Sequence, residues 1–140
     1  MPGYHLTEIP RGKIGDFSKI KEEFLEFCDA VEQKAHIMAL VELSDLLGSI
    51  KLFLFKNGYQ DQWSFIISDF IHQNECDVKD IKEKFKLIEN KTIDLSNYKL
   101  FLNVVNNYVY NYNMTINDLI LMSSITERVF KSGHRTSNTI

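Results

Sequence analysis

Apolar residues recur at helical spacing along most of the chain. In the first clear segment, Ile20, Phe24, Phe27 and Val31 fall on one narrow stripe when successive residues are placed about 100° apart. The residues between them are largely charged. This pattern predicts an amphipathic helix that begins after Asp16 or Ser18 and ends near Gln33, with its apolar stripe facing a core.

The next segment, Ile37 to Phe55, has apolar residues on all sides, which is typical of a helix buried on most of its surface. Asn57-Gly58 predicts its end. Further helices are predicted over residues 60–73, 78–88, 94–112 and 115–131. No Gly or Pro occurs between Gly58 and Gly133, which favours helices over hairpins. The sequence therefore predicts an all-α helical bundle.

Two acidic pairs lie on the first two predicted helices. Glu23 and Glu26 form one pair, within an E-E-x-x-E string, and Glu42 and Asp45 form the other, as E-x-x-D. Residues three apart share one helix face. Two facing helices could therefore direct all four carboxylates at one point, as helical bundles do when they build carboxylate metal sites.

The other acids of the first helix differ in position. Glu23 and Glu26 border the apolar stripe, whereas Glu22 and Asp29 point nearly the opposite way. Geometry therefore favours Glu23 over Glu22 as the inward partner of Glu26. We expect Glu22 and Asp29 to be solvated charges, and Glu32 as well.

The acidic pair on the second helix is less easily explained by a solvent-exposed helix face. The helix around Glu42 and Asp45 is too apolar to offer a wet side, and acids are seldom buried unless they are paired or bind a metal. Lysine partners are the alternative. The nearby basic residues Lys34 and Lys51 do not share the face of these acids, so a metal site is favoured.

The composition of the chain limits the kinds of partner that the protein is expected to bind. The chain has 140 residues, 44% hydrophobic and 25% charged, with a formal net charge of −3. One domain over residues 1–140 is expected. No basic stripe supports nucleic-acid binding, and no apolar run approaches the length of a membrane span. Two cysteines without a C-x-x-C pattern fit a reducing, cytoplasmic setting.

The acidic motifs carry a family resemblance. E-E-x-x-E followed by E-x-x-D on consecutive helices resembles the MazG-like, all-α nucleoside triphosphate pyrophosphohydrolases. EIPRGKIGDFSKIKEEF, VELSDLLGSI and MTINDLILMSSITERVFKSGHR resemble a small single-domain branch found in phages and bacteria. The similarity covers the beginning and the end of the chain. The middle, approximately residues 57–112, resembles a helical insertion.

The resemblance implies attack at the α-phosphorus of a (d)NTP, which gives a (d)NMP and pyrophosphate. Hard oxygen ligands suit Mg²⁺, with Mn²⁺ as an alternative. An acidic pocket would bind a triphosphate only through such cations. The implied ligands and catalytic residues are Glu23, Glu26, Glu42 and Asp45, and one of the glutamates could also accept the proton of the attacking water. The resemblance also implies a homo-oligomer, a dimer or a tetramer.

Some assignments stay open at this level. Arg11, Lys13 and Arg135 are candidates to contact substrate phosphates, although solvated cations are an equally good reading. A catalytically inactive helical interaction module is the alternative to an enzyme. A third possibility is a hydrolase of an atypical nucleotide, such as an alarmone, a damaged dNTP or phosphoribosyl-ATP.

Overall fold

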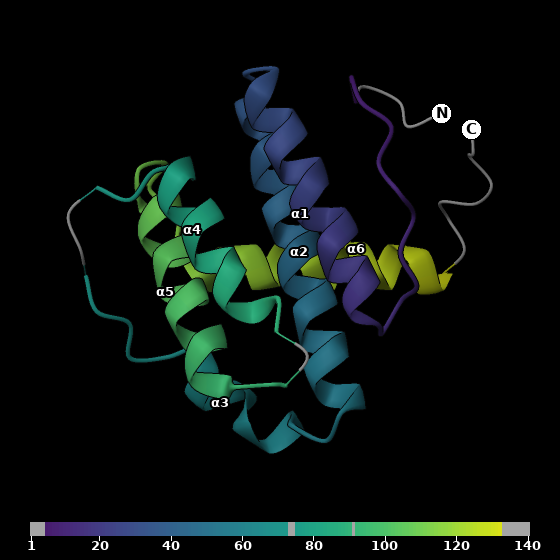
Figure 1. Ribbon diagram of the computed structural model, residues 1–140, viewed down its shortest axis with the longest axis vertical. Coiled ribbons are helices and arrows are strands. Elements are labelled where there is room, and N and C mark those ends of the chain that lie inside the picture. The colour runs from purple at the N-terminus through teal and green to yellow at the C-terminus, as the bar shows by residue number, and fades with distance from the viewer. Residues whose placement is uncertain (1–4, 73–74, 91, 133–140) are drawn as a thin grey trace. The chain divides into compact units, whose positions relative to one another are not determined.

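Regular secondary structure in the described part of the chain is entirely helical. The computed structural model describes residues 5–72, 75–90 and 92–132, the side chains of 125–132 excepted. The elements are α1 (Phe17–Glu32), α2 (His36–Lys56), the 3₁₀ helix η1 (Gln60–Gln62), α3 (Trp63–Ile66), α4 (Val78–Ile88), α5 (Leu95–Tyr110) and α6 (Ile116–Ser132) (Figure 1). This confirms the all-α class. Within the described residues, no helix combines the length and apolarity needed to cross a membrane.

The chain divides into two compact units. The first unit comprises Met1–Phe53 and Asn117–Ile140, and the second unit comprises Leu54–Ile116. Residues 57–112, which the family resemblance treats as an insertion, fall within the second unit, and their origin as an insertion stays a prediction. Each unit is described by itself below.

In the first unit, α1 and α2 form an antiparallel pair (Figure 1). Asp16 caps α1 by accepting a hydrogen bond from the Ser18 N–H at 3.1 Å. Lys34, in the turn after α1, has a φ of 59°. At the end of the pair opposite the connecting turn, the Phe17 and Phe53 rings meet edge to face with centroids 5.8 Å apart. The start of α1 therefore lies beside the end of α2.

The core of the first unit lies between the facing sides of its helices. Its fully buried apolar side chains include Ile20, Phe27, Leu43, Leu46, Leu47, Ile50 and Leu119. Helix α6 crosses the α1–α2 pair (Figure 1). A Cβ atom on Gly48 would lie 2.3 Å from the Ser123 Oγ and 3.6 Å from the Ser123 Cβ, so α2 and α6 lie close together at this position.

Residues 5–15, here called the lead-in, contain no helix and run along α1 (Figure 1). Gly12 fits against the beginning of α1, where a Cβ atom would lie 2.3 Å from the Ser18 carbonyl oxygen. The Gly12 N–H donates a hydrogen bond of 2.8 Å to Glu22 Oε1. The lead-in is thus attached to the helix that carries the first acidic pair.

The second unit is built around α4 and α5. Asp77 and Asp80 form a reciprocal capping box at the start of α4, and Asp94 caps α5. The Phe85 and Phe101 rings pack edge to face between the two helices, with centroids 5.6 Å apart. These helices confirm the predictions for residues 78–88 and 94–112.

The predicted helix over residues 60–73 is wrong in extent. The structure has only η1 and the single turn α3, and the chain is not helical at Ile71. The backbone of Ile71 is held by α5 instead, because its N–H donates to Asn103 Oδ1 at 2.7 Å and its carbonyl accepts from Asn107 Nδ2 at 3.0 Å. These long-range bonds replace the helical ones that local periodicity predicts.

Candidate metal centre

The structure brings the two predicted acidic pairs together. Carboxylate oxygens of Glu23, Glu42 and Asp45 all lie within 4.8 Å of one another. Glu26 belongs to two overlapping groups of the same size, one with Glu22 and Glu23, and one with Glu42 and a histidine. The antiparallel packing of α1 against α2 makes this convergence possible. We call Glu22, Glu23, Glu26, Glu42 and Asp45 the acidic cluster.

Burial of the acids is greater than the sequence suggests. Glu23 and Glu42 are each 6% exposed, in line with inward-facing side chains. Glu22 and Asp29, however, are only 8% and 7% exposed, so the expectation that they are solvated is wrong. The lead-in covers the outer face of α1 and removes both from solvent. Glu32 is exposed, as expected.

Asp29 anchors the lead-in. Its carboxylate accepts hydrogen bonds from His5 Nδ1 at 2.8 Å and from the Leu6 N–H at 3.1 Å. The Thr7 hydroxyl and the Gln33 amide also donate to it. Burial by itself would raise the pKa of Asp29, but the hydrogen bonds lower it below its ordinary value. Asp29 is therefore ionised and satisfied, and its role is structural.

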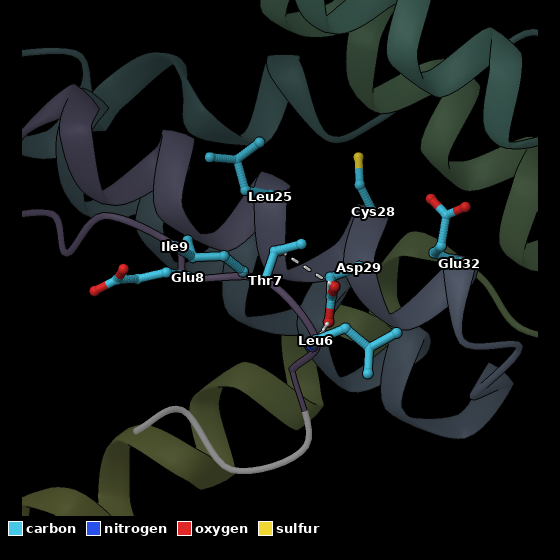
Figure 2. Close-up of a pocket in the computed structure, with 8 residues that line it drawn as sticks. All are labelled: Leu6, Thr7, Glu8, Ile9, Leu25, Cys28, Asp29 and Glu32. Carbon is cyan, nitrogen blue, oxygen red and sulfur yellow. Dashed lines mark hydrogen bonds between the residues drawn. The ribbon is translucent and has the colours of Figure 1, made fainter.

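A shallow groove of about 320 Å³ lies between the lead-in and α1 (Figure 2). Leu6, Ile9, Leu25 and Cys28 supply most of its apolar lining. None of the acidic cluster lines this groove, which is therefore separate from the candidate metal centre.

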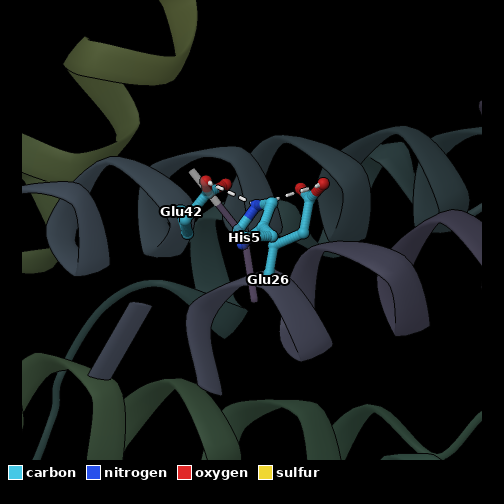
Figure 3. Close-up of side chains that lie close together, drawn as sticks. All are labelled: His5, Glu26 and Glu42. Carbon is cyan, nitrogen blue, oxygen red and sulfur yellow. Dashed lines mark ion pairs between the residues drawn. The ribbon is translucent and has the colours of Figure 1, made fainter. Parts of the chain in front are cut away.

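His5 reaches the acidic cluster from the lead-in. Its Nε2 atom lies 3.6 Å from Glu26 Oε2 and 3.7 Å from Glu42 Oε2 (Figure 3). The side chain is only 6% exposed. Sequence analysis missed His5, because helical periodicity cannot place a residue of an extended segment against helices that follow it.

Lys19 was also missed. Its Nζ atom lies 3.1 Å from Glu22 Oε1 and 3.1 Å from Glu23 Oε2. The two acids follow Lys19 by three and four positions on α1, so the spacing itself could have indicated the contact. Burial lowers the pKa of Lys19, but Glu23 and Glu22 raise it more, and the net shift is upward. Lys19 is therefore a permanent cation at the edge of the cluster.

The acids perturb one another. The pKa of Glu23 is raised to about 8, mainly by burial and secondly by the neighbouring Glu26. The pKa of Asp45 is raised to about 6, mainly by burial and secondly by the charge of Glu23. Burial also raises the pKa of Glu26. Within the described part of the chain, Glu23 Oε1 is a buried atom with no hydrogen-bond partner. Such a group of buried carboxylates is suited to hold a divalent cation.

The three candidate phosphate-binding residues do not belong to the acidic cluster. The side chains of Arg11 and Lys13 are exposed on the lead-in. Arg135 lies outside the described residues.

Comparisons with protein-family models, with curated proteins and with solved structures found no match for this chain. The functional interpretation therefore depends on the motifs and on the geometry of the acidic cluster.

Proposed function

We propose that the protein is a Mg²⁺-dependent nucleotide pyrophosphohydrolase that cleaves a (d)NTP into a (d)NMP and pyrophosphate. The observation that carries the proposal is that carboxylate oxygens of Glu23 on α1 and of Glu42 and Asp45 on α2 lie within 4.8 Å of one another. The resemblance of the two acidic motifs to MazG-like enzymes supports the same reaction.

The cluster has the character of a divalent-cation site. Its donors are hard carboxylate oxygens, which suit Mg²⁺ or Mn²⁺. Glu23 Oε1 is buried without a partner among the described residues, and burial together with neighbouring acids raises the pKa of Glu23 and of Asp45. When bound, the ion would neutralise phosphate charge and lower the pKa of a water.

The roles of the side chains follow from their positions. Glu23 and Glu26 on α1, with Glu42 and Asp45 on α2, would hold one or two divalent ions. One of the glutamates could also accept the proton of the attacking water. Lys19 is partly exposed, so its ammonium group could contact a substrate phosphate.

The direct test is pyrophosphate release by the purified, untagged protein with Mg²⁺ and a panel of NTPs and dNTPs. We expect Glu42→Gln and Asp45→Asn each to lower the rate by at least about 100-fold, because losing a direct ligand should exceed the effect of losing an outer-shell partner. Glu32→Gln is the matched control, since this acid of α1 is exposed.

Two results would count against the assignment. Wild-type rates in folded Glu42→Gln and Asp45→Asn variants would show that the cluster is not catalytic. A wild-type protein that releases no pyrophosphate from any nucleotide would favour the inactive interaction module. Including an alarmone and phosphoribosyl-ATP in the panel separates an atypical substrate from an ordinary dNTP.

A further inference from the structure

The orientation of His5 matches that of a metal-binding histidine. Its Nδ1 lies 2.8 Å from Asp29 Oδ2, and its Nε2 faces Glu26 and Glu42 (Figure 3). An ionised carboxylate can only accept a hydrogen bond, so Nδ1 carries a proton. In the neutral ring, Nε2 then offers its lone pair to the acidic cluster. A carboxylate that orients a histidine through its other nitrogen is the usual support of a histidine ligand.

The distances from Nε2 to the two glutamates also suit a shared ion. At 3.6 Å and 3.7 Å they exceed ordinary N–H···O hydrogen bonds, which span about 2.7–3.2 Å. Donor atoms bound at about 2.1 Å to one ion lie roughly 3.0–3.5 Å apart in octahedral or tetrahedral geometry. A small closing movement would bring the three groups onto one centre.

An independent observation indicates a ligand in the adjoining cluster. Glu23 is 6% exposed, and its Oε1 is buried without a partner in the described chain. One carboxylate oxygen of Glu23 lies within 4.8 Å of one oxygen of Glu42 and one of Asp45. Glu42 also belongs to the group with His5 and Glu26, so the two groups share one carboxylate.

We propose that His5 Nε2, Glu26 and Glu42 form a nitrogen-containing site for a divalent first-row transition-metal ion. The site adjoins the all-oxygen group of Glu23, Glu42 and Asp45, and Glu42 serves both. Imidazole favours transition metals over Mg²⁺. His5 therefore determines the class of metal that one half of the centre takes. The inference rests on the proposed function only in requiring that the acidic cluster binds divalent ions.

Calorimetric titrations of Co²⁺ and Mg²⁺ into untagged wild type, His5→Gln and His72→Gln test this directly. His72 is exposed in the second unit and is the matched control. We expect His5→Gln to weaken Co²⁺ binding by at least about tenfold and to change Mg²⁺ binding by less than about threefold. Equal changes for both ions would overturn the proposal, because a histidine that serves only as a counter-ion or packing group would not discriminate between them.

A second measurement needs no substitution and remains informative if His5→Gln is unstable. NMR of wild-type protein with nitrogen-labelled histidine and bound cadmium should show a one-bond coupling between the metal nucleus and Nε2 of His5. Bound cadmium without this coupling would overturn the proposal.

The test of the His5 metal site can be distinguished from the test of the proposed enzymatic function. If His5→Gln selectively weakens Co²⁺ binding but no nucleotide is hydrolysed, the metal site is supported and the enzymatic function is rejected. If Mg²⁺-dependent pyrophosphate release is found but neither measurement implicates His5, the function survives and this inference is overturned.

Discussion

Glu23 illustrates how burial and neighbouring acids favour the neutral form of a single carboxyl. It is buried on α1, and one of its oxygens has no hydrogen-bond partner among the described residues. Burial and the adjacent Glu26 raise its pKa to about 8, against the opposing effect of Lys19. Without a metal, this residue is therefore more stable in its neutral form.

The pH dependence of stability follows from that shift. The pKa of Glu23 is about 8 in the folded state and near the ordinary value of 4.5 in the unfolded state. Between these values the unfolded state binds fewer protons, so the free energy of unfolding falls as pH rises. Asp45, with a pKa of about 6, acts in the same direction. We expect the metal-free protein to lose on the order of a few kcal/mol over this range.

Thermal unfolding in the presence of a chelator, from about pH 5 to pH 9, measures this effect across the range of shifted pKa values. Glu23→Gln should remove much of the pH dependence and raise the melting temperature at the alkaline end. Glu32→Gln, an exposed acid on the same helix, should leave the profile unchanged. A flat profile in the metal-free wild type would contradict the prediction.

At the scale of elements, the lead-in completes the candidate site. It supplies His5, covers Glu22 and Asp29, and is held to α1 by hydrogen bonds to both acids. An extended segment has no hydrogen-bonded ladder of its own, so its position depends on these few contacts. Gly12 is the point of closest approach.

We expect Gly12→Ala to displace the lead-in. The added Cβ would lie 2.3 Å from the Ser18 carbonyl oxygen and 2.5 Å from the Lys19 Cα, and neither backbone atom can rotate away. The expected loss of stability is about 1–3 kcal/mol, as for other overpacked sites. Faster cleavage by trypsin after Arg11 or Lys13 would report the displacement.

A matched control for this substitution is Glu8→Ala, because Glu8 is an exposed residue of the same segment. If Gly12→Ala melts and is cleaved like the wild type, the lead-in is not held by close packing at this glycine.

At the scale of the whole molecule, the candidate chemistry belongs to one of two compact units. His5 and every member of the acidic cluster lie in the first unit, whereas α4 and α5 lie in the second. A bound ion stabilises the structure that holds its ligands, by about 2.7 kcal/mol when its free concentration is about 100 times the Kd.

Hydrogen exchange should therefore distinguish the two units. Saturating Mn²⁺ is expected to slow amide exchange in α1 and the part of α2 up to Phe53, by up to about 100-fold where exchange requires this unit to open. Exchange in α4 and α5 should change little. Equal slowing in both units would show that they unfold together, and no slowing at all would argue against the metal centre.

Local patterns in the sequence determined the helices and the shared faces of the acidic pairs. Apolar periodicity predicted α1, α4 and α5, because each of these helices buries one stripe of its own residues, and a segment that is apolar on all sides predicted α2. The i, i+3 spacing placed Glu23 beside Glu26 and Glu42 beside Asp45, since both relations lie within a single helical turn.

Only the tertiary structure decided the surroundings of those acids. His5 and Asp29 are 24 positions apart, and Ile71 and Asn103 are 32 apart, so no local period connects them. The first contact buries an acid that periodicity assigns to solvent and brings a histidine to the cluster. The second prevents a helix that periodicity predicts. Both depend on extended segments, whose polar groups bond to whichever helix they pack against.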